Sequence, residues 1–162
     1  TARLIHEGKL DIGLTGKMES DNKLIFDKIG EYQDIFVATK EYLKTLSVQG
    51  NDSVEILRNS NLMLLDENNI SRLYIDHYFQ RHGIETRNFL EITTMDLLIE
   101  FAKIGLGVAC VMKEFVLDEL RSSELIEISL PEPIEKREVG FSYTPSCKNQ
   151  KSVDKFLSLH SR

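Results

Sequence analysis

The clearest pattern of hydrophobic and polar positions lies at residues 93–112, which read TTMDLLIEFAKIGLGVACVM. Its first half places apolar side chains along one helical face, at Leu97, Leu98, Phe101 and Ala102. Thr94 can cap this helix, and Gly105 can end it in the left-handed conformation. The unbroken apolar run at 108–112 then indicates a strand that is covered on both faces. The segment therefore predicts a helix followed by a buried strand of an α/β sheet.

The rest of the chain continues this alternation of strands and helices. Strands are predicted at 10–15, 24–29, 35–39, 62–65, 87–93, 125–130 and 137–143, with a polar loop at 16–22. Helices are predicted at 1–6, 41–46, 53–58, 71–82, 113–120 and 152–159. Ser53 and Ser71 can cap two of these helices, and Gly83 can end the second one. Such alternation is typical of an α/β fold.

The start of the sequence looks like the middle of a larger unit. Residues 1–6 resemble the tail of a helix, and the strand at 10–15 follows directly. A strand-helix-strand unit takes roughly 30 residues or more. We therefore expect at least one strand of this unit to precede this sequence.

Composition and charge narrow the possible functions. The 162 residues are 41% hydrophobic and 28% charged, which is typical of a globular chain with a hydrophobic core. The net charge is -6 and the basic residues are scattered, so the chain alone is not expected to bind nucleic acid. No apolar run approaches the roughly 20 residues of a membrane span, so no membrane partner is expected. Cys110 and Cys147 form no spaced framework, which favours a reducing cytoplasm.

Motifs for catalysis or metal binding are absent from the sequence. Residues 105–107 read Gly-Leu-Gly but lack the third glycine of a dinucleotide fingerprint, and they follow a helix instead of a strand. His77 and His82 are five residues apart, which aligns them poorly for a shared metal on one helix. Cys110 lies in an apolar strand, where a thiol is inert. We therefore expect no catalytic residue, no metal and no cofactor.

Small polar residues occur where strands end and helices begin. They are Thr15, Gly16, Asn68, Asn69, Ser71, Thr93 and Thr94. In an open α/β sheet such ends gather at one edge, where the N–H groups of a helix start can bind a small anion or carboxylate. Each residue alone can equally be an ordinary helix cap or loop residue. Their occurrence at three such places favours a binding cleft for a small molecule.

Four segments carry a resemblance to a known family. They are 4–14 (LIHEGKLDIGL), the strand-loop-helix at 62–83, 93–112, and 124–143 (ELIEISLPEPIEKREVGFSY). In order and spacing they resemble the effector-binding domain of LysR-type transcriptional regulators. The resemblance implies two Rossmann-like α/β lobes hinged by two crossing strands, similar to type 2 periplasmic binding proteins. Residues 1–36 and 140–162 would form lobe I, whose first strands are missing, and residues 37–139 would form lobe II.

The resemblance also implies a function. A small-molecule inducer would bind in the cleft between the lobes and control transcription, with DNA bound only by a helix-turn-helix domain outside this chain. Thr15 with Gly16, Asn68 with Asn69, and Thr93 with Thr94 fall on segments that line the family's cleft. A cytoplasmic homodimer or homotetramer is implied as well. Met112 is a departure, because the family usually has proline after the Gly-Leu-Gly strand.

Two other functions stay open at this point. A solute-binding protein of a transport system would have the same two-lobed fold, as would a small enzyme of similar shape. A secretion signal would favour transport, an upstream basic helix-turn-helix would favour regulation, and turnover of a metabolite would favour catalysis.

Overall fold

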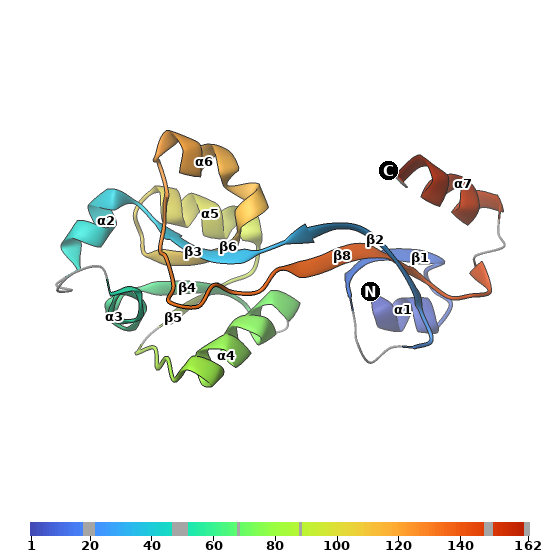
Figure 1. Cartoon of the computed structure of the whole chain (residues 1–162), viewed down its shortest axis with the longest axis horizontal. Coiled ribbons are helices and arrows are strands. Elements are labelled where there is room, and N and C mark those ends of the chain that lie inside the picture. The colour runs from blue at the N-terminus through green and yellow to red at the C-terminus, as the bar shows by residue number, and fades with distance from the viewer. Residues whose placement is uncertain (18–21, 47–51, 68, 88, 148–150, 161–162) are drawn as a thin grey trace. The chain divides into compact units, whose positions relative to one another are not determined.

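The chain forms two compact units. A computed structural model describes residues 1–17, 22–46, 52–67, 69–87, 89–147 and 151–160. Unit 1 comprises Thr1–Tyr32 and Lys136–Arg162, and unit 2 comprises Gln33–Glu135, so the chain passes between them twice (Figure 1). The lobe boundaries implied by the resemblance, after residues 36 and 139, fall within the strands Asp34–Ala38 and Arg137–Tyr143 and stay a prediction.

Unit 1 contains a three-stranded antiparallel sheet with β8 (Arg137–Tyr143) at its centre. Strand β1 (Ile12–Gly16) pairs with one side of β8, and β2 (Ile25–Tyr32) pairs with the other. The helices are α1 (Ala2–His6), which buries Ile5, and α7 (Lys151–His160). Residue 140 must be glycine, because a Cβ atom there would lie 2.3 Å from the carbonyl oxygen of Asp27 on β2.

Unit 2 is built on a five-stranded mixed sheet. The strand order is β5 (Phe89–Ile92), β4 (Leu62–Leu65), β6 (Val108–Met112), β3 (Asp34–Ala38) and β7 (Ile126–Glu127). Strand β4 runs parallel to both β5 and β6, whereas β3 runs antiparallel to β6 and β7. The helices are α2 (Lys40–Thr45), α3 (Ser53–Asn59), α4 (Ile70–His82), α5 (Met95–Lys103), the 3-10 helix η1 (Lys113–Phe115) and α6 (Leu117–Ser122).

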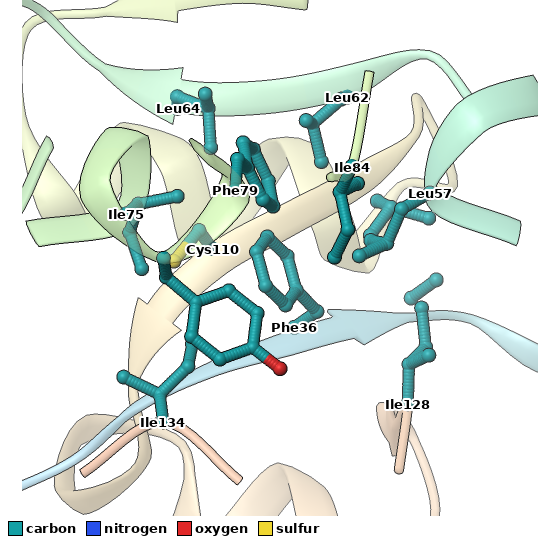
Figure 2. Close-up of a cluster of buried hydrophobic side chains, with 13 residues drawn as sticks. Phe36, Leu57, Leu62, Leu64, Ile75, Phe79, Ile84, Cys110, Ile128 and Ile134 are labelled. Atoms are coloured by element: carbon teal, nitrogen blue, oxygen red, sulfur yellow. The ribbon is translucent and has the colours of Figure 1, made fainter. Parts of the chain in front are cut away.

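Hydrophobic side chains cover both faces of this sheet. Because successive strand residues point to opposite faces, Leu62 and Leu64 enter one cluster and Met63 enters the other. The first cluster includes Phe36 and Phe79, whose rings stack with centroids 5.7 Å apart (Figure 2). The second cluster is completed by residues of α5, namely Leu98, Ile99 and Ala102. The buried apolar strands predicted from the sequence are therefore central strands covered by helices.

Helix and strand ends differ from the predictions at several places. The predicted cap Ser53 is wrong, since Asp52 caps α3, and the predicted cap Ser71 is wrong, since Asn69 caps α4. Both serines lie inside the first turn and are buried, so neither occupies the capping position. The predicted ends are confirmed, because Gly83 and Gly105 have φ angles of 60° and 74°.

Two predicted elements are shorter or divided. The strand predicted at 125–130 is only the two-residue β7, and the last backbone hydrogen bond of this segment to β3 runs from the N–H of Ile128 to the carbonyl of Phe36 at 2.8 Å. The helix predicted at 113–120 is divided into η1 and α6 at Val116, whose side chain is fully buried. Of the helices in the described ranges, none has the length and apolar character that crossing a bilayer requires.

Candidate functional site

The carboxyl ends of β4 and β5 meet at one edge of the sheet in unit 2. Leu65 lies opposite Ile92 in the parallel ladder, and the N–H of Asp66 donates to the carbonyl of Ile92 at 3.1 Å. Helix α4 begins shortly after β4, and α5 begins shortly after β5. The sheet therefore brings the starts of two helices to the same edge.

Polar side chains cap both of these helix starts. The side-chain oxygen of Asn69 accepts a hydrogen bond from the N–H of Ser71 at 2.9 Å. The hydroxyl of Thr94 accepts one from the N–H of Leu97 at 3.4 Å. Thr93 and Thr94 are exposed, whereas Ser71 is buried. Since the first turn of a helix has about four N–H groups without intrahelical partners, each cap leaves others that can bind a ligand.

A small cavity lies behind the two helix starts. Its volume is about 10 Å³, and its lining is Asp34, Leu64, Leu65, Ser71, Arg72, Ile75, Met95 and Cys110. The cavity therefore joins the first turns of α4 and α5 to the start of β3. Asp34 and Ser71 are only 1% and 4% exposed, so the cavity has buried polar groups in its wall. This volume suits about one water molecule, so it can be the floor of a site but cannot hold a metabolite.

Arg72 fixes the start of α4 against the sheet. Its Nη1 donates to the carbonyl of Leu65 at 3.1 Å and to Glu91 at 2.9 Å, and its Nε donates to Asp76 at 2.9 Å. The guanidinium also lies 4.4 Å from the centre of the Phe89 ring. Burial lowers the pKa of Arg72, but the hydrogen bonds to the two carboxylates outweigh it, so the net pKa is raised. Arg72 thus joins α4 to both β4 and β5 as a permanent cation.

The predicted residues Thr15 and Gly16 lie in the other unit. They are the last two residues of β1, so the predicted strand end at Thr15 is one residue short, and Gly16 lies in the strand instead of the predicted loop. The hydroxyls of Thr15 and Ser142 lie 2.6 Å apart and form a hydrogen bond between β1 and β8. Gly16 lies opposite Val139 in the same ladder. Asn68 lies outside the described residues. Within unit 2 the structure brings together Asn69, Ser71, Thr93 and Thr94.

A network of ion pairs follows the end of β1. The carboxylate of Glu138 lies 2.7 Å from Lys17 and 2.8 Å from Lys28, and Lys28 also lies 2.6 Å from Glu31. Hydrogen bonds from Lys17 and Lys28 lower the pKa of Glu138 from its ordinary 4.5 to about 2. Local sequence patterns could not predict this network, because Glu138 is more than 100 positions from Lys17 and Lys28. Both lysines of this network are paired with glutamates, so the network does not offer an unpaired positive charge to an effector.

Metal ligands do not gather in the described part of the chain. No group of three or more His, Cys, Asp or Glu side chains there has the arrangement that could hold a metal ion. Cys110 is buried and Cys147 is partly buried, and both are reduced thiols.

Comparison with known proteins identifies the family. The sequence model of the LysR substrate binding domain matches residues 1–160. The chain belongs to this family. The resemblance to LysR-type regulators found in the sequence is therefore confirmed. The predicted α/β fold, similar to that of periplasmic binding proteins, is confirmed as well. No match was found among curated proteins.

Solved structures of regulatory domains have the same fold as this LysR substrate-binding domain. The regulatory domain of CrgA, a LysR-type regulator from Neisseria meningitidis, has a TM-score of 0.75 at 17% identity, over 99% of this chain and 78% of that one. The CcmR regulatory domain from Synechocystis PCC6803, in complex with 2-PG, scores 0.80 at 16% identity, over 98% and 76%. The bromide-bound regulatory domain of HypT from Salmonella typhimurium scores 0.79 at 14% identity, over 98% and 74%. The family and these neighbours are domains of transcription regulators.

Proposed function

We propose that this LysR substrate-binding domain binds its small-molecule effector at the edge of unit 2 where α4 and α5 begin. The observation that carries the proposal is the meeting of two capped helix starts above a cavity with buried polar groups. Asn69, Ser71, Thr93 and Thr94 are the proposed contacts from this unit. Thr15, Gly16 and Asn68 are proposed as further contacts on the family resemblance.

A carboxylate or another small anion is the proposed class of effector. The starts of α4 and α5 both present N–H groups and the positive end of a helix dipole at this edge. Two domains with this fold were solved with ligands, since CcmR holds 2-PG and HypT holds bromide, which is an anion. Asp96 lies in the first turn of α5, and its negative charge partly offsets the positive end of the helix dipole. The effector must therefore also form hydrogen bonds with the capping side chains.

The regulatory step follows from linkage between binding and conformation. An effector shifts a regulator only by as much as it prefers one arrangement of the protein over another. We propose that the effector acts in this way on a helix-turn-helix domain outside this chain, in a cytoplasmic homodimer or homotetramer. The domain is proposed to sense its ligand without converting it and to have no membrane partner.

A ligand screen tests this proposal. Small carboxylates and phosphorylated metabolites are added to the 162-residue chain, and its melting temperature is measured. A ligand at about 100 times its Kd stabilises the folded state by about 2.7 kcal/mol, which raises the Tm of a chain this long by about 5 to 10 °C. The double variant Asn69→Ala/Thr94→Ala should lose most of the shift. A shift that stays equal in the double variant would place the ligand elsewhere and refute the site.

A further inference from the structure

A second pocket lies on the other half of α4, away from the helix start. It has a volume of about 260 Å³. One wall is a single face of α4, on which Tyr74, Tyr78 and Arg81 stand at helical spacing with two histidines. The other wall is the extended segment 132–135, which precedes β8. Both walls belong to unit 2, so the pocket is complete within this unit.

The two walls of this pocket are held in place by buried groups. The hydroxyl of Tyr78, a residue only 8% exposed, donates to the carbonyl of Glu132. Ile134 is 5% exposed in the core, and its carbonyl accepts from the side-chain amide of Gln33 at 2.7 Å. The centres of the His82 and Tyr78 rings lie 4.3 Å apart. The pocket is therefore preformed, and a ligand would not have to order its walls.

The two walls carry opposite charges. The cation Arg81 lies on the α4 wall, whereas the carboxylates of Glu132 and Glu135 lie on the facing segment. Glu132 has His82 3.6 Å away. Within the described ranges, neither Arg81 nor Glu135 takes part in an ion pair of 4.0 Å or less, so both remain available to a ligand.

We propose that this pocket binds a small zwitterion of the amino-acid class. Its carboxylate binds Arg81, its ammonium group binds Glu135 and Glu132, and its carbon skeleton lies against the ring of Tyr74. A simple carboxylate would meet repulsion from the glutamates, and a simple amine would meet repulsion from Arg81. The volume lies below the roughly 300 to 1,000 Å³ of pockets for drug-sized ligands, which suits a metabolite of this size.

Calorimetric titration of the 162-residue chain tests this assignment. The probes are α-amino acids with glycine, leucine and phenylalanine side chains, and the ω-amino acids 4-aminobutyrate and 6-aminohexanoate. At least one zwitterion should bind, and its N-acetyl and amide derivatives should each bind about 10-fold or more weakly, because each lacks one charge. Preference for α- or ω-amino acids tells which spacing of charges fits. No binding of any probe at about 10 mM, or equal binding of the derivatives, would overturn the assignment.

Single variants locate the bound zwitterion. Arg81→Gln and Glu135→Gln should each weaken binding about 10-fold or more, with the melting temperature nearly unchanged because both side chains are exposed. Arg121→Gln is the matched control for Arg81→Gln and should leave binding of the zwitterion unchanged, since Arg121 is an exposed helical arginine on α6. Binding should also be unchanged in Thr94→Ala. Affinity lost in Thr94→Ala but kept in Arg81→Gln would mean that the ligand occupies the helix-start site, and this inference would fail while the proposed function stood.

Discussion

Thr94→Ala separates binding from capping at the start of α5. The hydroxyl of Thr94 accepts from the N–H of Leu97 at 3.4 Å, a long hydrogen bond, so the loss of the cap should destabilise the fold by only about 0.5 to 1 kcal/mol. That loss lowers the Tm of a chain of this length by about 1 to 4 °C. If the hydroxyl also binds a charged effector, its removal weakens binding by about 1.5 to 3 kcal/mol, which is roughly 10- to 150-fold in Kd.

The assay combines calorimetric titration and thermal melting on the same protein samples, with the effector found by the ligand screen. Thr39→Ala is the matched control, because Thr39 caps α2 by accepting from the N–H of Tyr42 at 3.2 Å. Strand β3 begins at Asp34, which lines the cavity of the candidate site, and Thr39 follows its other end. Thr39 is therefore a helix cap outside the site. This control should lower the Tm and leave the Kd unchanged. Thr94→Ser keeps the hydroxyl and should restore most of the affinity.

One result would refute the role of Thr94 in binding. If Thr94→Ala lowers the melting temperature but leaves the effector's Kd unchanged, Thr94 is only a helix cap. The contacts would then have to come from Asn69 and Ser71 at the start of α4.

Three further changes test the reading of the fold. Arg72→Met should lower the free energy of unfolding by about 2 to 3 kcal/mol in urea denaturation, because a buried hydrogen bond to the carbonyl of Leu65 and partly buried ones to two carboxylates are lost; a loss below about 0.5 kcal/mol would show that α4 is held mainly by other contacts. Gly140→Ala should destabilise by about 1 to 3 kcal/mol, since its Cβ would clash with Asp27, and an unchanged melting temperature would contradict the tight pairing of β8. The pKa of Glu138 is depressed to about 2, so the stabilising effect of its carboxylate is present above pH 4.5 and is lost as the pH falls toward 2. Glu138→Gln should therefore flatten the pH dependence of Tm between these values. An unaltered slope would mean that the ion pairs do not form in solution.

Sequence alone was enough for elements whose signals are local. The helix α5 could be predicted from the spacing of Leu98 and Ala102, the cap Thr94 and the terminal Gly105, because each acts through atoms within one helical turn. The strand β6 could be predicted because four of its five residues are buried and apolar. The predicted polar positions Asn69 and Thr94 also lie at helix starts for this local reason.

Only the tertiary structure decided which of these local elements meet. Strand β8 lies between β1 and β2, and the hydrogen bond between Thr15 and Ser142 joins residues 127 positions apart, which no local spacing encodes. Burial placed Ser71 inside the first turn of α4 and left the capping position to Asn69. Arg72 became the link between α4 and two strands because its partners Leu65 and Glu91 are brought together by the parallel ladder. Local residue patterns fix backbone conformation, whereas the neighbours of a side chain depend on how the strands pair across the whole chain.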